Sequence, residues 1–426
     1  MITCFILSET EFTFNYMQKE FSFYKIFSEF FILGLYSFGG PTAHIGFFQE
    51  KFVKRKKWLS EKKFMEFVSL SQFLPGPSSS QVGFLIGLQK GSYWGGLAAW
   101  LGFTIPSAFL MILSALIIVS YTNTNGMSEA VKFLNGFASV AIPIIAAALI
   151  NMGKNFCFEI KRLLIFFISF FTLLIWEFPF EQVIIISLGF ALGVFFNLKD
   201  KAIKDAKLSI GEIIISKKNL NLLLLIFILV SIFFLILLPI INVYNDILYL
   251  KIFSGLYKSG SLVFGGGHVV LPYLEKEFVF NNLISKELFN GGYGLAQALP
   301  GPLFSFASYI GTLIGASNDI LHALFLGISS LIFIFLPGLM IATLAINYWN
   351  RLIKLNWVYN GIHGVNATVV GLLCLTFVDI LFSNYLSNIN GILLIILSTL
   401  LIIFLKFPSW LSVVIMGPIG YILYSF

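Results

Sequence analysis

The chain has 426 residues, of which 58% are hydrophobic and 11% are charged, and its mean hydropathy is +0.92. So few charged residues cannot give a soluble domain of this length its polar exterior, which excludes a soluble globular enzyme or binding module. The formal net charge is +7, but the basic residues cluster in short loops between apolar segments. That pattern is typical of membrane proteins with positive cytoplasmic loops, so nucleic-acid binding is not expected.

The apolar runs predict an all-α polytopic membrane protein with about ten to thirteen transmembrane segments, since a helix needs about 20 apolar residues to cross the hydrocarbon. After a tail at 1–20, an apolar helix over Phe21–Phe38 ends at a glycine cluster, Gly39 and Gly40 followed by Pro41. Proline lacks the backbone donor and glycine adds backbone freedom, so the helix should break there. A second helix, Phe64–Leu74, breaks at the sequence LPGP, and serines begin the helix that follows.

The same order of features recurs about 225 residues later in the chain. The residues KIFS occur at 25–28 and 251–254, the glycine cluster after Phe38 recurs after Phe264, and the QxLPGP stretch at 72–77 recurs at 297–302. We therefore predict two homologous membrane domains, 21–196 and 247–426. They are joined by 197–246, a basic linker (197–218) expected in the cytoplasm and a connecting helix.

Loop charges predict that the two halves have inverted topology. The loop after the first glycine cluster is rich in lysine, from Lys51 to Lys63, whereas its counterpart carries three acids and two lysines: Glu275, Lys276, Glu277, Lys286 and Glu287. Opposite orientations explain this exchange of sign. If 219–242 and 247–267 both crossed the membrane, the halves would be parallel, so inversion requires that one of them is a broken or re-entrant helix.

Two matching helix breaks are the sequence feature that points to a transport site. Non-helical backbone at membrane depth is tolerated where protein or a water-filled cavity satisfies it, and the free N–H groups of half-helices bind anions. Serine hydroxyls and glutamine amides would add donors for a tetrahedral dianion. The candidate substrate-binding residues are Gly39, Gly40, His44, Gln72, Pro75, Gly76, Pro77, Ser78, Ser79, Gln81, Lys258, Gly265, Gly266, Gly267, His268, Gln297, Pro300, Gly301, Pro302 and Ser305.

Ionisable residues in apolar segments each allow two interpretations. His44 and His268 either contact the anion or lie at the membrane interface, and neither has the ligand spacing of a metal site. Lys258 either extends to an interface or supplies the one full positive charge in the site. Glu66, in the helix before the first LPGP, is either exposed at the interface or a carrier of coupling protons.

These stretches resemble the chromate ion transporter family, two-domain form. The resemblance rests on FGGPTAHIG at 38–46, SQFLPGPSSSQ at 71–81 and AAWLGFTIPS at 98–107 in the first half, with FGGGHVVLP at 264–272 and GLAQALPGPL at 294–303 in the second. It implies a secondary active transporter, not an enzyme, that exports chromate driven by the membrane potential or a proton gradient. Alternating access is the mechanism expected of such a two-fold scaffold, and chromate's likeness to sulfate in shape and charge links the two anions.

Other functions remain open at this point. The same scaffold serves equally for sulfate or another small anion, and a non-transport membrane protein is a remote alternative because no catalytic motif stands in the apolar helices. The expected partners are chromate, the lipid bilayer and a second copy of the chain as a homodimer, with no cofactor. The expected location is the plasma (inner) membrane.

Overall fold

The computed structural model describes residues 21–176, 181–198, 217–245, 247–264, 266–316, 319–352, 355–386 and 388–425. Within these ranges the chain is helical and has no strand, which confirms the all-α fold class. The tail at 1–20, the linker lysines within 199–216 and Gly265 lie outside the described residues.

The helices of the first repeat are α2 (Phe23–Tyr36), α3 (Gly40–Phe48), η1 (Gln49–Arg55), α4 (Glu61–Phe73), α5 (Ser78–Asn125), α6 (Met127–Phe156), α7 (Ile160–Ile175) and α8 (Glu181–Phe195). The connecting stretch is α10 (Lys217–Ile232), η2 (Phe233–Leu237) and α11 (Leu238–Asn245). The second repeat consists of α12 (Leu248–Leu262), η3 (Gly267–Val269), α13 (Val270–Leu274), η4 (Glu275–Val279), α14 (Lys286–Ala298), η5 (Leu303–Ser305), α15 (Phe306–Gly315), α16 (Ile320–Leu352), α17 (Asn356–Ile380), η6 (Leu381–Tyr385), α18 (Ile389–Thr399), η7 (Leu400–Phe404) and α19 (Ser409–Leu423).

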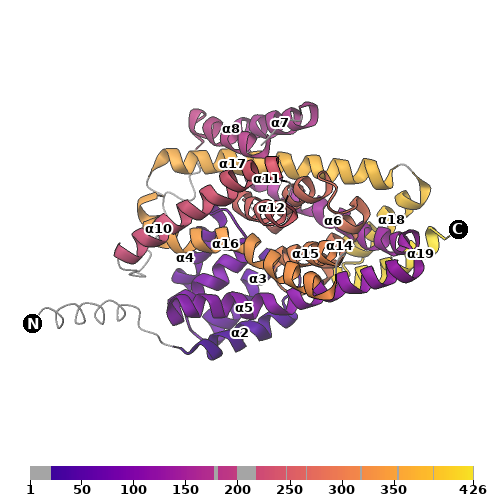
Figure 1. The fold of residues 1–426 in the computed structure, drawn as a ribbon. Helices are drawn as coiled ribbons and strands as arrows, with labels where there is room; N and C mark the ends of the chain where they lie inside the picture. Colours follow the sequence, from indigo (N-terminus) through magenta and orange to yellow (C-terminus); the bar gives the residue numbers. More distant parts are fainter. Residues whose placement is uncertain are drawn as a thin grey trace, which may run out of the picture.

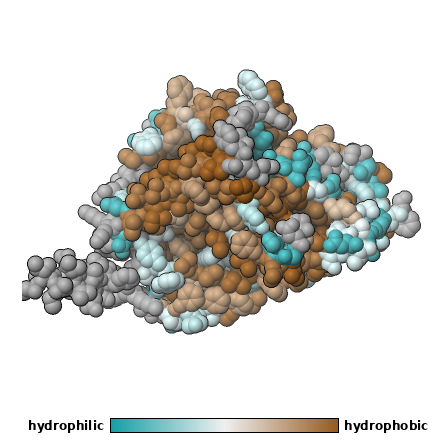
Figure 2. Space-filling model, viewed as in Figure 1, coloured by the Kyte–Doolittle hydropathy of each residue, from teal (hydrophilic) through white to brown (hydrophobic). Residues whose placement is uncertain are grey.

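The protein is a multi-pass integral membrane protein. Among the described residues five helices are long and apolar enough to cross a bilayer: Ser78–Asn125, Met127–Phe156, Asn219–Ile241, Ile320–Tyr348 and Asn356–Ile380. A broad apolar band covers the face in Figure 2, with hydrophilic residues gathered mainly toward the right-hand end and in smaller patches at the left. The described residues therefore contain five candidate crossings and a larger set of shorter helices, and the total of ten to thirteen segments stays a prediction.

In the first half, α2 with α3 and η1 forms one hairpin, and α4 with the first part of α5 forms a second. The open ends of both hairpins lie together, and we call this end the base. Phe21, just before α2, donates its N–H to the Lys90 carbonyl (3.1 Å), and its ring lies 4.9 Å from that of Trp58. The chain reverses at Gly91 and Ser92, where the backbone leaves helical geometry. The starts of α2 and α4, the end of η1 and this reversal therefore lie at one end, while the glycine cluster and LPGP lie at the hairpin tips.

The second half repeats this plan. The Lys258 ammonium of α12 lies 2.6 Å from Glu277 of η4, and the Tyr309 hydroxyl of α15 donates to the Leu288 carbonyl of α14 (2.9 Å). Equivalent serines cap the second arm of each half: Ser60 Oγ accepts from the N–H of Lys63, and Ser285 Oγ accepts from that of Leu288. These caps satisfy backbone donors where α4 and α14 begin.

A single helix shows that the two hairpin bases lie at opposite ends of the molecule. α16 begins beside the second-half base, where His322 packs on Gly315, and it reaches the first-half LPGP at Gly338, whose Cα lies against Gly76. α12 therefore ends at Leu262 in the interior and does not span the molecule, whereas Asn219–Ile241 is long and apolar enough to cross a bilayer. That combination gives the inverted topology, because a broken helix in place of a crossing reverses the second half.

The two halves also interlock on their outer sides. α7 and α8 of the first half pack on α17 of the second, at the top of Figure 1, where Gly189 meets the Thr368 side chain. α18 and α19 of the second half pack on α6 of the first, where Gly136 meets the Met416 carbonyl. The repeats are therefore not separate globular units, because each covers a central helix of the other.

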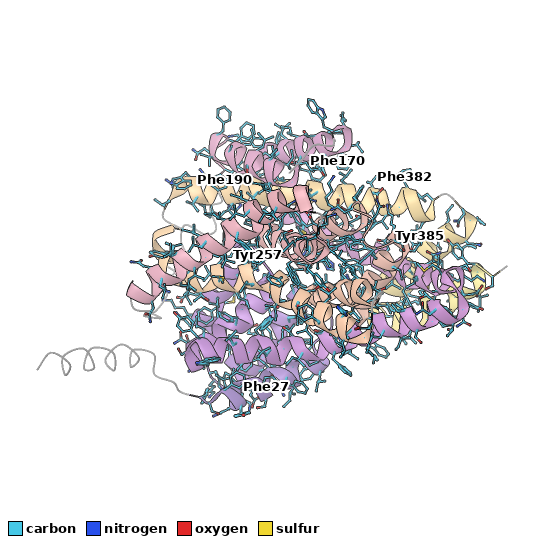
Figure 3. All side chains as sticks on the ribbon, in the orientation of Figure 1. Phe27, Phe170, Phe190, Tyr257, Phe382 and Tyr385 are labelled. Atoms are coloured by element: carbon cyan, nitrogen blue, oxygen red, sulfur yellow. The ribbon has the colours of Figure 1, made fainter. Side chains whose placement is uncertain are left out.

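Aromatic side chains fill the spaces between these helices (Figure 3). Phe27 of α2 stacks on Phe31, with ring centroids 5.6 Å apart, and Tyr257 of α12 stacks on Phe234 at 5.0 Å. Tyr257 and Tyr385 are fully buried, and each hydroxyl has a partner: Ser231 Oγ for Tyr257 and the Asn135 carbonyl for Tyr385. Buried tyrosine hydroxyls usually find such a partner, although the buried Tyr273 hydroxyl has none.

The inverted arrangement predicts which loops a membrane-impermeant reagent reaches. Lys57 and Asn282 are repeat equivalents, both exposed and both with positive φ (50° and 55°). With the native cysteines replaced by serine, we expect Lys57→Cys and Asn282→Cys to be labelled from opposite faces of sealed vesicles. The measurement is labelling of right-side-out against inverted vesicles, and labelling of both from one face would contradict the inverted fold.

Candidate functional site

Four helix ends meet in the interior, and all four are breaks that the sequence dictates. α2 ends before Gly39, α12 ends before Gly266, and α4 and α14 end at the two LPGP stretches. Each break leaves backbone N–H and C=O groups without helical partners, which is costly away from water. These groups must therefore find partners across the fold.

The partners come from the opposite half. The Gly76 N–H of the first LPGP donates to the Val263 carbonyl at the end of α12 (2.7 Å). The Gly301 N–H of the second LPGP donates to the Ser37 carbonyl at the end of α2 (2.9 Å). Gly76 and Gly301 are repeat equivalents, and so are Ser37 and Val263, so these two hydrogen bonds form a symmetric pair that joins the halves.

Both LPGP glycines are held in a conformation that favours glycine. Gly76 has φ +119° and Gly301 has φ +97°. A methyl group on Gly76 would lie 2.8 Å from the Cα of Gly338, and one on Gly301 would lie 2.9 Å from Ser107 Oγ. Ser107 and Gly338 each follow a proline inside a long helix, Pro106 in α5 and Pro337 in α16. Each LPGP thus packs on the proline-containing crossing helix of the other half, and the structure is closed at this point.

A polar chain extends from this junction to the start of α5. His44 of α3 is buried, and its Nε2 lies 3.1 Å from the Ser37 carbonyl, so this nitrogen carries the proton and donates. Its Nδ1 lies 3.2 Å from Ser79 Oγ in the first turn of α5. His44 therefore connects the first glycine cluster, the second LPGP and the N-terminus of α5. Only 1% of the His44 surface is exposed, so its ring is enclosed by protein.

Serines continue the chain on the other side of Gly301. The hydroxyls of Ser107 and Ser305 lie 2.6 Å apart, Ser107 donates to the Thr104 carbonyl (2.9 Å) and Ser305 to the Pro302 carbonyl (2.6 Å). Ser305 was expected at the site, whereas the contribution of α5 through Thr104 and Ser107 was not. The signal available for them was the hydroxyls around Pro106 in an otherwise apolar helix.

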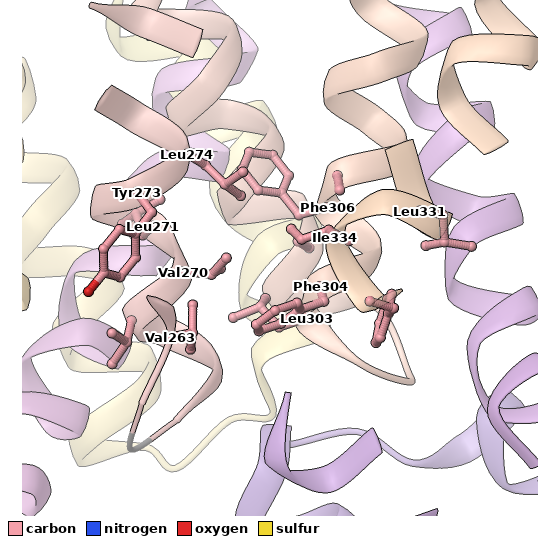
Figure 4. Close-up of a cluster of buried hydrophobic side chains, with 14 of the residues drawn as sticks. Val263, Val270, Leu271, Tyr273, Leu274, Leu303, Phe304, Phe306, Leu331 and Ile334 are labelled. Carbon is pink, nitrogen blue, oxygen red and sulfur yellow. The ribbon is translucent and has the colours of Figure 1, made fainter. Parts of the chain in front are cut away.

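His268 of the second half faces α14 and not an N-terminal turn. Its Nδ1 lies 2.9 Å from the Tyr293 hydroxyl, and Tyr293 is buried. Gln297, one turn farther along α14, places its buried Nε2 beside the same Tyr293 hydroxyl. Buried apolar side chains of α12, α13, η5 and α16 surround this side of the junction (Figure 4), among them Val263, Leu303 and Ile334.

Several buried polar atoms at the breaks have no hydrogen-bond partner, although other such atoms lie elsewhere in the described residues. Those beside the glycine cluster, the first LPGP stretch and the facing part of α5 are Ser37 Oγ, Ser71 Oγ, Ser80 Oγ, Gln81 Oε1 and Thr104 Oγ1. All but the Gln81 oxygen are able to donate a hydrogen bond. The Gln81 amide nitrogen is engaged, donating to the carbonyls of Pro75 (2.8 Å) and Gly338 (2.9 Å). Donors left without acceptors at a buried junction suit a bound anion.

The remaining predicted residues divide into those at the breaks and those away from them. Those with backbone at the junction are Gly39, Gly40, Pro75, Pro77, Ser78, Gly266, Gly267, Pro300 and Pro302, while Gly265 lies outside the described residues. Gln72 is exposed, unlike its repeat equivalent Gln297. Of the two glutamines that precede the LPGP stretches, only Gln297 in the second half therefore has a buried amide nitrogen.

The two predicted charged residues are already paired. Lys258 lies 2.6 Å from Glu277, so its charge is neutralised within its own hairpin and does not stand as a lone positive charge in the site. Glu66 is buried, with Lys63 Nζ 3.6 Å away one turn earlier in α4. Its exposure at an interface is therefore ruled out, and its role in proton coupling stays a prediction.

Known proteins place the chain beside transporters. The family model described as chromate transporter matches residues 24–194 and 250–421. An uncharacterized transporter from Methanocaldococcus jannaschii is 28% identical over 409 residues, covering 94% of each chain. Chromate transport proteins of Pseudomonas aeruginosa (22% identical, 84% of this chain and 81% of the relative) and Cupriavidus metallidurans (23%, 80% and 78%) also match. No solved structure matches the chain.

The closed packing at Gly301 predicts a large effect of a single methyl group. Gly301→Ala forces a left-handed backbone that costs about 1–2 kcal/mol for a residue with a Cβ, and it also displaces Ser107. We expect a lower unfolding temperature in detergent. Gly153→Ala is the matched control, because nothing lies within 4 Å of a methyl group there. Equal unfolding temperatures for the two variants would contradict the assigned packing.

Proposed function

This chain belongs to the chromate transporter family, and we propose that it exports chromate by alternating access, with the anion held where the four helix breaks meet. Members of this family are transporters and not enzymes. The observation that carries the proposal is the crosswise pairing of Gly76 with Val263 and of Gly301 with Ser37. Inverted halves whose broken helices meet at midmembrane are the arrangement that secondary transporters use for their substrate sites.

The chemistry of the junction supports an oxyanion as the cargo. Chromate is a tetrahedral dianion with four acceptor oxygens, and the junction has buried hydroxyl donors without partners, including Ser37, Ser80 and Thr104. The N-terminal turn of α5 adds backbone N–H groups and a positive partial charge. Neutral donors can hold a dianion and still release it, because no fixed full charge must be separated from it.

Alternating access would work on the contacts that now close the junction. Opening toward either face requires one LPGP to separate from the proline-containing helix of the other half, at Gly76–Gly338 or at Gly301–Ser107. Because these contacts are equivalent by the repeat, breaking one while keeping the other gives two opposite open states. The anion would replace the lost hydrogen bonds at the opened side.

Sulfate is the second candidate cargo, because it has chromate's shape and charge and the junction has no feature that distinguishes the two anions. Export driven by the membrane potential or a proton gradient is part of the proposal. The plasma-membrane location, the cytoplasmic linker at 197–218 and the homodimer stay predictions.

Inverted membrane vesicles test the cargo directly. Export predicts that labelled chromate accumulates in inverted vesicles containing the protein, and that an ionophore collapsing the gradient abolishes accumulation. Inhibition by excess sulfate would place both anions in one site. Accumulation no greater than in vesicles without the protein, with insertion verified, would exclude chromate as cargo.

Thr104 tests the site separately from the fold. Thr104→Val removes a hydroxyl with no protein acceptor, so stability should hold or rise, while the KM for chromate should rise roughly 10- to 100-fold, as expected from losing a hydrogen bond of about 1.5–3 kcal/mol to a charged group. Thr343→Val is the control, because that buried hydroxyl donates to the Leu339 carbonyl (2.8 Å). It should cost stability and leave KM unchanged. An unchanged KM for Thr104→Val would remove this hydroxyl from the site.

A further inference from the structure

A cavity of about 240 Å³ lies outside the junction, between α7, α8, η4 and α17. Its polar lining consists of Glu181 and Gln182 of α8, Glu275 and Lys276 of η4, and Thr376 and Asp379 of α17. The volume is ample for several water molecules. The proposed function assigns no role to this cavity.

The charges around the cavity sum to one net negative charge when all groups are ionised. Lys276 pairs with Glu181 at 3.0 Å, and Lys286 of α14 bonds to Asp379 while lying 3.8 Å from Glu275. Three carboxylates thus share two ammonium groups, and Glu275 is the carboxylate that lies farthest from a lysine nitrogen. This sign disfavours an anion in the cavity and favours a cation.

Two buried oxygens in the cavity wall are acceptors without donors. Glu275 Oε1 and Gln182 Oε1 have no hydrogen-bond partner, and the two residues are 3% and 5% exposed. The Gln182 amide nitrogen is already used, donating to the Pro272 carbonyl (3.2 Å), which fixes its oxygen as the free end. A buried acceptor with no donor is costly, and a proton on the Glu275 carboxyl would supply the missing donor.

The cavity lies toward the face opposite the basic linker. Asn360 near the start of α17 donates to the Asn197 side chain, which adjoins the linker (2.7 Å). Asp379 lies about 28 Å farther along α17, at 1.5 Å per residue, a distance close to the hydrocarbon thickness. If the linker is cytoplasmic, the cavity is reached from outside the cell.

The first half lacks this acid. The repeat equivalent of Glu275 is Gln49, which donates to Glu61 (2.6 Å), and the equivalent of Glu61 is Lys286. In the first half, a permanently neutral amide (Gln49) contacts a carboxylate (Glu61). In the second half, a titratable acid (Glu275) lies beside an ammonium group (Lys286). The repeat therefore conserves a polar contact here, and only the second half makes it able to bind a proton.

We propose that the Glu275 carboxyl is the site that binds the coupling proton of this transporter, an inference that rests on the proposed chromate transport. η4 continues directly from α13 and η3, which begin at the glycine cluster and carry His268. A change of charge at Glu275 therefore acts on the hairpin arm that contributes to the substrate junction. One proton enters from the opposite face and adds to the carboxylate while chromate moves the other way.

The charged groups around Glu275 determine how readily its carboxylate takes up a proton. They are Lys286 of α14, Asp379 of α17, Glu181 of α8 and Lys276 of η4, while Glu277 of η4 is paired with Lys258 of α12 and α7 contributes Leu173 and Leu174. Protonating Glu275 releases Lys286 to Asp379 alone. Both lysines then have one carboxylate each.

The test uses the purified full chain in liposomes and separates coupling from transport. Glu275→Gln should lose chromate accumulation driven by a pH gradient, yet retain exchange of labelled for unlabelled chromate at equal pH, which moves no net proton. Glu287→Gln, an exposed acid near the start of α14, is the control and should retain both activities. Glu275→Asp should restore accumulation, with a changed pH dependence.

Several results would overturn the assignment. Gradient-driven accumulation by Glu275→Gln at the wild-type rate excludes the site, and so does loss of exchange together with accumulation. A wild-type flux that follows a sodium gradient and ignores pH excludes the proton. If the wild-type protein moves no chromate, the proposed cargo is wrong, and the proton site is tested without transport by the infrared band of protonated carboxyl groups in acidic against alkaline buffer. Because all 20 Asp and Glu residues contribute to that band, the wild-type spectrum minus that of Glu275→Gln should contain one titrating carboxyl component, and its absence contradicts the assignment.

Discussion

The rest of the structure depends on one constraint: a helix that stops inside a bilayer must have its exposed backbone groups satisfied by protein. Four helices stop in the interior of this chain, and each half supplies what the other lacks, through the Gly76–Val263 and Gly301–Ser37 hydrogen bonds. Because no water is available to replace these bonds in the hydrocarbon, the halves cannot separate freely. The inverted topology is what brings the four breaks to one depth.

The same constraint would let the junction serve both as a structural joint and as the proposed substrate site. Backbone groups use the strongest partners, carbonyls of the opposite half, while hydroxyls such as those of Ser80 and Thr104 are left as donors. An anion arriving there satisfies groups that the closed protein does not. Close packing of Gly301 on Ser107 and of Gly76 on Gly338 means that binding and opening have to be linked.

The two halves match in backbone but differ in charge, and that difference makes the two ends of the molecule chemically distinct. The ion pair between the arms of the first hairpin joins Glu29 of α2 to Lys51 of η1 (3.0 Å), whereas the second half places Lys258 on α12 and Glu277 on η4. The buried acid Glu275 has only an amide, Gln49, as its counterpart. A symmetric scaffold permits movement both ways, and an acid on one side alone makes the two faces respond differently to protons.

The sequence by itself determined the membrane class, the repeat and the four breaks, because apolar length, glycine and proline act on the chain locally. It also indicated inversion through loop charge, although it could not show that α12 stops at Leu262. Only the tertiary structure decided that His44 is buried beside Ser79, that Lys258 is neutralised by Glu277, and that Gln72 is exposed while Gln297 is not. It also added Thr104 and Ser107 to the site and brought Glu181, Glu275 and Asp379 around one cavity. Contacts between residues more than 250 positions apart, such as Gln81 and Gly338, depend on how whole helices pack, and no local pattern in the chain carries that information.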